Sequence, residues 1–270
     1  LEVDEFKGVV GKFAWIATIE SVSAGMCSLT KPFYDKLYGE LNYQVDGRQL
    51  SDTQIDPSAQ ISQTVFIGSN VKIGKNTKIM PGCVILPNTT IGEDSIIFPN
   101  VTVYPYCSIG ARCRVPAGTV IGCDGFGYNL IDGEHKKIWH LYGVVIEDEV
   151  EIGSNANIDN GAFIETRIGF RSRIDNDVQI SHNVHIGQNV VVCGKTGLAG
   201  SVEVSDYCAF GAQSGVAPGA RLGKGVQVAA RGAISENAVI EPGKIMAGHP
   251  ARPVNEWLKS QAVVRKLMKK

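Results

Sequence analysis

The sequence is governed by an aliphatic residue that returns every six positions. Isoleucine or valine begins each of twelve consecutive hexads from Ile55 to Ile121. A second series of thirteen hexads runs from Ile168 to Ile240, with an isoleucine, valine, leucine or phenylalanine at every step. Between the two series, and before a jump of four residues to Ile168, the same step continues through Ile146, Ile152, Ile158 and Ile164. A period of six matches neither the 3.6-residue turn of a helix nor the simple alternation of a strand.

The fourth position after each aliphatic residue is nearly always small or β-branched, as at Val65, Thr77 and Cys83. Glycine often follows the aliphatic residue directly, as at Gly68 and Gly187. This pattern predicts short strands separated by corners, with one large side chain per strand pointing into a shared interior. The predicted fold class is all-β, a parallel β-helix of hexapeptide repeats.

Composition excludes several classes of protein. The 26 basic and 27 acidic residues give a net charge of −1, unlike a dedicated nucleic-acid binder. The sequence has no apolar run of the roughly 18 residues that cross a bilayer, and its first residues do not resemble an export signal. Seven cysteines, an odd number without a CxxC pair, favour reduced thiols and a cytoplasmic protein. Four of them occupy the small inward position, and Cys123 is expected to be an incidental surface thiol.

The hexads divide the chain into three parts. Residues 1–54 lack the repeat and are interpreted as a short N-terminal region. Residues 55–253 form the β-helix, interrupted at 124–145 by glycines, aromatic residues and charges that predict a loop. Residues 254–270 follow Pro253 and predict a helix that caps the solenoid. Its apolar residues at helical spacing are Val254, Trp257, Leu258, Val264, Leu267 and Met268. Its basic face is either a solvated surface or a docking surface for an acidic partner.

His182 is the best candidate for a catalytic residue. It lies two positions after the inward Ile180, at an outward-facing corner where it has no packing task. An imidazole with an ordinary pKa of about 6.5 suits a general base near neutral pH. Gly200 is eighteen residues further on, directly above His182 in the next coil, and offers a backbone N–H to a developing oxyanion. The alternative is a surface histidine that stacks under a glycine by chance.

Two other kinds of site are disfavoured. A zinc site of His182, His185 and a third histidine would resemble that of the β-helical carbonic anhydrases, but that family spaces its histidine pair more widely, so no metal site is expected. The glycines of Gly125–Gly127 lack the third glycine and helix start of a dinucleotide-binding fingerprint. We therefore also expect no tightly bound cofactor.

Four segments carry a specific resemblance. GCDGFGY, KIWHLYGVVIEDEVEIGSNANID, IDNDVQISHNVHIGQN and LAGS resemble, in the same order, the UDP-3-O-acylglucosamine N-acyltransferases of lipid A biosynthesis. The resemblance implies a left-handed β-helix with eighteen residues per coil, and homotrimers with each site between two subunits. It also implies that His182 deprotonates the attacking amine, that Gln179 and Asn183 beside it bind the substrate, and that Gly200 is the oxyanion donor. The donor would be a thioester on the phosphopantetheine arm of acyl carrier protein.

The chain departs from that family in three places. Where the family has a second histidine, the segment SGVAPGARL has Gly219. Residues 1–54 are about half as long as the family's uridine-binding domain. The segment SLTKPFY only partly matches the family's F-x-x-N-P-x-Y motif, with Ser28 and Lys31 in place of the aromatic residue and the asparagine. These departures leave open whether the nucleotide is UDP or dTDP.

Two alternative functions follow. The segment AGHPARPV is similar to one in acyl-CoA-dependent sugar acetyltransferases. The chain would then be an acyl-CoA-dependent N-acyltransferase of another nucleotide-linked amino sugar. A non-catalytic β-helical scaffold is the third interpretation.

The interruption at residues 124–145 is expected to be an ordered flap. It contains Phe126, Tyr128, Trp139 and Tyr142, and long insertions in compact folds are usually functional or disordered. The resemblance places it beside the active-site cleft, so Phe126 and Tyr128 are expected near His182, where they bind substrate. The alternative is a loop that only packs its aromatic rings on the coil surface.

Overall fold

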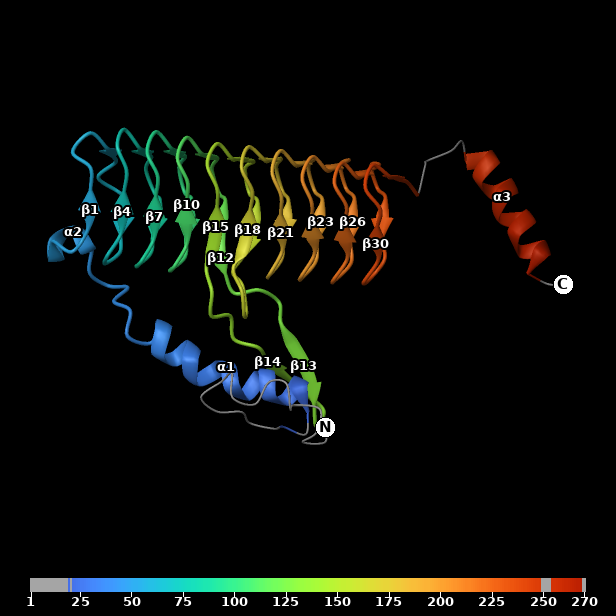
Figure 1. Cartoon of the computed structure of the whole chain (residues 1–270), viewed down its shortest axis with the longest axis horizontal. Helices are drawn as coiled ribbons and strands as arrows, with labels where there is room; N and C mark the ends of the chain where they lie inside the picture. The colour runs from blue at the N-terminus through green and yellow to red at the C-terminus, as the bar shows by residue number, and fades with distance from the viewer. Residues whose placement is uncertain (1–18, 20, 249–253, 269–270) are drawn as a thin grey trace.

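The computed structural model describes residues 19, 21–248 and 254–268. Its main body is a straight solenoid in which the chain winds through three parallel sheets (Figure 1). The predicted parallel β-helix is confirmed. Strands from successive coils pair in register at a separation of eighteen residues, as Ile55 does with Ile73 and Ile180 with Leu198.

The first sheet has ten strands, which are β1 (Gln54–Ile55), β4 (Lys72–Ile73), β7 (Thr90–Ile91), β10 (Ser108–Ile109), β15 (Val144–Ile146), β18 (Thr166–Ile168), β21 (His185–Ile186), β24 (Glu203–Val204), β27 (Arg221–Leu222) and β30 (Val239–Ile240). The second sheet also has ten, which are β2 (Gln60–Ile61), β5 (Lys78–Ile79), β8 (Ile96–Ile97), β11 (Arg114–Val115), β16 (Glu151–Ile152), β19 (Arg173–Ile174), β22 (Val191–Val192), β25 (Ala209–Phe210), β28 (Gln227–Val228) and β31 (Ile245–Met246). The third sheet has nine, which are β3 (Phe66–Ile67), β6 (Val84–Ile85), β9 (Thr102–Val103), β12 (Val120–Cys123), β17 (Asn157–Asp159), β20 (Gln179–Ile180), β23 (Gly197–Leu198), β26 (Gly215–Val216) and β29 (Ala233–Ile234).

The hexad aliphatic residues form one continuous core along the solenoid axis. Most of them are fully buried, from Ile67 in the first coils to Ile234 near the end. The small inward position is buried too, and its hydroxyl or thiol group donates to a backbone carbonyl of the next coil, as from Thr77 to Gly92 and from Cys83 to Phe98. A larger side chain at that position would have no room beside the corner.

Glycine after the aliphatic residue permits the close approach of the next corner. A Cβ atom on Gly68 would lie 2.5 Å from the backbone nitrogen of Pro87, well inside van der Waals contact. The corners themselves use left-handed backbone conformations, many at asparagine or aspartate, which tolerate them better than most residues. Asn70 (φ 52°) also donates its side-chain amide to Asn88 of the next coil at 2.8 Å.

One predicted hexad position is wrong. Ile164 is 48% exposed and lies outside the core, and the small polar Thr166 is buried at the start of β18 instead. The four extra residues of this coil displace the aliphatic side chain outward. Ile146 consequently pairs with Ile168, twenty-two residues further on.

Residues 124–145 form a hairpin rather than a loop. β13 (Tyr128–Ile131) and β14 (Glu134–Lys137) pair in antiparallel fashion around a two-residue turn, Asp132–Gly133, in which both residues have positive φ. Aspartate followed by glycine favours this turn type, so the sequence did contain the signal. Figure 1 shows the hairpin projecting from one side of the solenoid.

Helix α1 (Val22–Tyr38) packs against this hairpin. The Ser21 side chain accepts from the N–H of Ala24 and begins the helix. Thr30 accepts a hydrogen bond from the N–H of Trp139 at 3.0 Å, and the thiol of Cys27 donates to the carbonyl of Lys136 at 3.3 Å. The N-terminal region therefore forms one side layer together with the insertion of the β-helix.

The two ends of the solenoid differ. The short helix α2 (Gly47–Leu50) lies at the first coil, where Arg48 donates to the carbonyl of Val65 at 2.6 Å. Helix α3 (Val254–Leu267) forms where the sequence predicts it, but Figure 1 shows it set apart from the last coil. Its Leu258, Val264, Leu267 and Met268 are exposed, so it does not cap the solenoid of this single chain, and the side chains of Val254 and Trp257 lie outside the described part. Among the helices of the described ranges, none is long and apolar enough to cross a membrane.

Candidate active site

His182 lies at the corner where the chain passes from the third sheet to the first, between β20 and β21. The two irregularities of the hexad pattern occur at the same corner in preceding coils. The hairpin insertion leaves the solenoid after β12, and the extra residues 160–165 lie between β17 and β18. The departures from the repeat thus gather beside this one histidine.

Asn183 fixes the orientation and tautomer of the His182 ring. Its Oδ1 lies 3.0 Å from Nδ1 of His182 and accepts from the N–H of Ala162 at 3.3 Å. Its amide nitrogen donates to the carbonyl of Ile164 at 2.9 Å, which assigns oxygen and nitrogen on the Asn183 side chain. Because Oδ1 is an acceptor, Nδ1 of His182 carries the proton. Nε2 of the neutral ring is therefore unprotonated and has the lone pair that a general base needs.

Gly200 packs directly against the same ring. A Cβ atom on this glycine would lie 2.5 Å from Cε1 and 2.6 Å from Nε2 of His182, so only glycine leaves room for the imidazole. The N–H of Gly200 makes no hydrogen bond to any of the described residues. A free N–H beside a base is the arrangement that an oxyanion donor requires.

Two cavities meet at His182. One, of about 490 Å³, is lined by Phe126, Ser181, His182, Ala199, Gly200, Ser201, Pro218, Gly219 and Asn237. The other, of about 310 Å³, is lined by Met26, Gly127, Ile138, His140, Ala162, Phe163, Ile164, His182, Asn183, His185, Ser201 and Glu203. The imidazole thus contacts two separate volumes, as a base between two substrates would.

The hairpin brings Phe126 to the site, as expected, and Tyr128 only indirectly. Phe126 lines the larger cavity and is 85% exposed, while Tyr128 contacts Phe126 with ring centroids 5.1 Å apart. Gly125 makes the closest approach, because a Cβ atom there would lie 2.8 Å from Cβ of His182.

Gln179 takes part in a partly buried polar group around Asp159, behind the corner. Its side-chain amide donates to Oδ1 of Asp159 at 3.0 Å, and the thiol of Cys123 lies 3.6 Å from the same oxygen. Burial raises the pKa of Asp159, and burial together with Asp159 raises the pKa of the Cys123 thiol to about 12. Cys123 is therefore not the surface thiol that the sequence suggested. All seven cysteines are free, as predicted.

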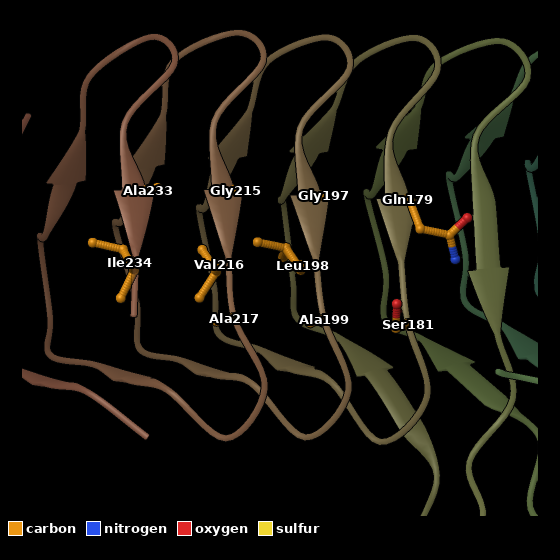
Figure 2. Close-up of a pocket in the computed structure, with 10 residues that line it drawn as sticks. All are labelled: Gln179, Ser181, Gly197, Leu198, Ala199, Gly215, Val216, Ala217, Ala233 and Ile234. Carbon is orange, nitrogen blue, oxygen red and sulfur yellow. The ribbon is translucent and has the colours of Figure 1, made fainter. Parts of the chain in front are cut away.

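A shallow groove of about 430 Å³ continues from this corner along the third sheet. Figure 2 shows Gly197, Gly215 and Ala233 side by side on successive strands, with Gln179 at one end. Ala199 and Ala217 line it as well, and Ser181 and Ala199 also line the larger cavity at His182. A floor of glycine and alanine backbone suits an extended apolar group.

The remaining candidate residues are placed as follows. Gly219 has a positive φ of 69°, and a Cβ atom there would lie 2.3 Å from Oδ1 of Asn237, so a histidine would be strained at this position. Ser28 and Lys31 lie on α1, and Lys31 approaches the Trp139 ring at 4.8 Å and pairs with Asp35. No group of three or more histidine, cysteine or acidic residues in a metal-binding arrangement occurs in the described part of the chain. Residues 249–253 of the segment AGHPARPV lie outside it.

His140 was not identified as a site residue from the sequence. It is fully buried and its ring meets the His182 ring, with centroids 5.2 Å apart and planes at 67°. It is one of only five histidines in the chain, and it follows the hairpin directly. Residues 124–145 leave and rejoin the solenoid at the corner of His182, so recognising the hairpin in the sequence would have placed His140 near His182.

The curated relatives that match this chain have the name of the family that the sequence resembles. The family model described as "GMPPB C-terminal domain" matches residues 50–125. A UDP-3-O-acylglucosamine N-acyltransferase of Helicobacter hepaticus is 44% identical over 155 residues, which cover 57% of this chain and 47% of that protein. The protein of the same name from Wolinella succinogenes is 45% identical over 163 residues, covering 60% and 51%. The chain thus spans about half the length of the curated relatives that it matches.

Solved structures give the same architecture. A UDP-N-acetylglucosamine acyltransferase from Bacteroides fragilis superposes with a TM-score of 0.58 at 25% identity, covering 71% of this chain and 70% of that one. The UDP-N-acetylglucosamine acyltransferase from Campylobacter jejuni gives 0.50 at 24% identity, with 69% of each chain covered. The second likeness bears on the fold alone.

Proposed function

We propose that this chain is an N-acyltransferase that moves a 3-hydroxyacyl group from acyl carrier protein to the amine of a UDP-3-O-acylglucosamine-like substrate, in lipid A synthesis. The observation that carries the proposal is the His182 ring, whose tautomer leaves Nε2 unprotonated between two cavities. The names of the relatives at 44% and 45% identity support the same reaction. Free thiols throughout the chain suit a reducing cytoplasm.

In the proposed reaction, Nε2 of His182 accepts a proton from the amine as its nitrogen attacks the thioester carbonyl. The carbonyl oxygen gains negative charge, which the N–H of Gly200 stabilises. Collapse of the tetrahedral intermediate forms the amide and expels the phosphopantetheine thiolate, which takes the proton from His182. The chemistry needs no covalent acyl-enzyme.

The two cavities divide the substrates between them in this proposal. The larger cavity continues into the groove of Gly197, Gly215 and Ala233, which suits the apolar acyl chain. The smaller cavity carries the polar side chains of Asn183, His185 and Glu203, which suit the sugar. The amine of the sugar meets the thioester where the two cavities join at His182, and Phe126, on the wall of the larger cavity with Tyr128 packed against it, covers the amine there from the hairpin side. Gln179 holds Asp159 behind the corner, and Asn183 orients the base.

The decisive experiment combines donors and acceptors in a matrix. Acyl carrier protein and CoA thioesters are tested against UDP- and dTDP-linked amino sugars, with amide formation followed by mass spectrometry. Transfer from acyl carrier protein alone to the UDP-3-O-acyl amino sugar supports the proposal. Transfer from acyl-CoA to another nucleotide-linked amino sugar would establish the alternative, which the segment AGHPARPV favours. Absence of transfer in every combination would leave a β-helical scaffold.

A homotrimer is expected, with each site completed by a neighbouring subunit. The corner of His182 and the groove of small residues both lie open on the surface of the single chain, and a pocket that excludes water needs a second wall. Sedimentation equilibrium should give three times the chain mass of 29.0 kDa. A monomer that retains full activity would contradict the shared site.

Replacing Phe126 and Tyr128 by serine should raise KM for the amino sugar several-fold and leave Tm nearly unchanged. Both side chains are exposed, so the loss of their packing costs little stability. The matched control is Leu130→Ser, an exposed position of the same hairpin that lines neither cavity at His182. A large fall in Tm with an unchanged KM would instead mean that these two side chains at the base of the hairpin only stabilise the fold.

A further inference from the structure

His140 is a buried polar residue that the proposed reaction does not yet use. It lies between β14 and β15 with no exposed surface, and neither Nδ1 nor Nε2 has a hydrogen-bond partner among the residues that the structure describes. Buried polar atoms are nearly always paired, so two unpaired nitrogens on one ring need an explanation.

The ring of His140 lies against the ring of His182. The two rings meet edge to face at a centroid distance of 5.2 Å. Gly125 and Gly127 also lie against this ring, since Cβ atoms there would lie 2.9 Å from Nε2 and 3.2 Å from Cε1 of His140. A Cβ atom on Gly125 would lie 2.8 Å from Cβ of His182 too, so the start of the hairpin insertion contacts both histidines.

Packing alone does not account for an imidazole at this position. A phenylalanine or leucine would fill the same space without leaving polar atoms unpaired, and an unpaired buried group is destabilising. What an imidazole adds is a dipole. Neither of its nitrogens has a partner at normal hydrogen-bond geometry among the described residues, and the backbone of Ile138 interacts with the ring only weakly. The ring can therefore turn an unprotonated nitrogen towards a neighbouring positive charge.

We propose that His140 is a positioning residue whose neutral dipole stabilises the charge that His182 gains when it accepts the proton of the attacking amine. This inference rests on the proposed function. The effect acts through His182, because the His140 ring borders the smaller cavity but has no solvent-exposed surface of its own.

The protonation state of His140 fits this role. Burial, and next the charge of His182, lower its pKa to about 4. The ring is therefore neutral at any pH at which an amine attacks, and it does not compete with His182 for the proton. The charged and titratable groups that face the two rings from the surrounding elements are Asp124, Lys137, Asp159, His185 and Glu203. Asp124 and Lys137 form an ion pair and act on His140 in opposite directions.

The kinetic test uses His140→Phe, which keeps a ring, and His140→Gln, which restores a neutral dipole. His140→Phe is expected to lower the plateau of kcat about tenfold without a matching change in KM, and to move the acid limb of the pH–rate profile to lower pH. His140→Gln should recover part of the loss. His135→Phe, at an exposed position of β14, is the control. If His140→Phe has the wild-type plateau and pH profile, His140 only fills space and the proposal is overturned.

A second measurement does not depend on activity. In the full-length chain, NMR titration of the His140 ring should give a midpoint near pH 4. The midpoint should rise in His182→Phe, since the charge of His182 contributes to lowering the pKa. An unchanged midpoint would overturn the coupling even in an active enzyme. A raised midpoint in a chain that transfers no acyl group would overturn the proposed function instead, and with it the role of His140 in catalysis.

Discussion

Replacing His182 by alanine is expected to lower the rate of acyl transfer by about 10²–10⁴-fold, which is the usual contribution of a general base. His182 lines both cavities at this corner, whereas His185 lines only the smaller one and its Nε2 donates to the carbonyl of Glu165 at 3.0 Å. Steady-state kinetics at pH 7 with a saturating thioester donor measure the effect. The variant should keep its fold, since His182 lies outside the hydrophobic core.

The pH dependence of the variant separates this role from a binding role. Without the base, the rate should rise with pH as more of the substrate amine becomes unprotonated, and part of the loss should be recovered at high pH. The exposed His135→Ala serves as the control and should keep the wild-type profile. Near-wild-type turnover of His182→Ala on a genuine substrate would remove His182 from the mechanism.

The β-helix could be predicted from the sequence because its core is local in sequence. Each coil needs one large and one small side chain that point inward, and these recur at fixed positions of the hexad. The burial of Ile67 and Val71 can therefore be predicted from their place in the repeat alone. The position of His182 over Gly200 followed from the same arithmetic, because neighbouring coils pair at a separation of eighteen.

The surroundings of the site could not be predicted in this way. They depend on contacts between segments far apart in the chain, such as Thr30 with Trp139 and Asn129 with Ser23, which no local periodicity encodes. The outward displacement of Ile164 has the same origin, because only the alignment of neighbouring coils shows where four extra residues leave the core. His140 was missed because its importance lies in a ring contact across the hairpin base, not in its neighbours in sequence.

Adding one methyl group at Gly200 is expected to lower kcat about 10²-fold while Tm changes little. The backbone of Gly200 does not require positive φ, so alanine is tolerated there conformationally. Its Cβ atom would lie 2.5 Å from Cε1, 2.6 Å from Nε2 and 3.1 Å from Nδ1 of His182, so the ring itself must move. The bond to Asn183 and the contact with Gly125 restrict that movement on the other sides. A base displaced by about 1 Å loses a factor of this size.

The same coil offers a matched control. Gly197→Ala adds the same methyl group three residues earlier, where nothing lies within 4 Å of the new atom. Because Gly197 lines the groove proposed for the acyl chain, this change should alter KM for the donor at most and leave kcat intact. Measuring kcat for both variants at a saturating donor concentration therefore isolates the position of the imidazole. Equal kcat values for Gly200→Ala and Gly197→Ala would mean that the rate does not depend on where the His182 ring lies, which is incompatible with its action as the base.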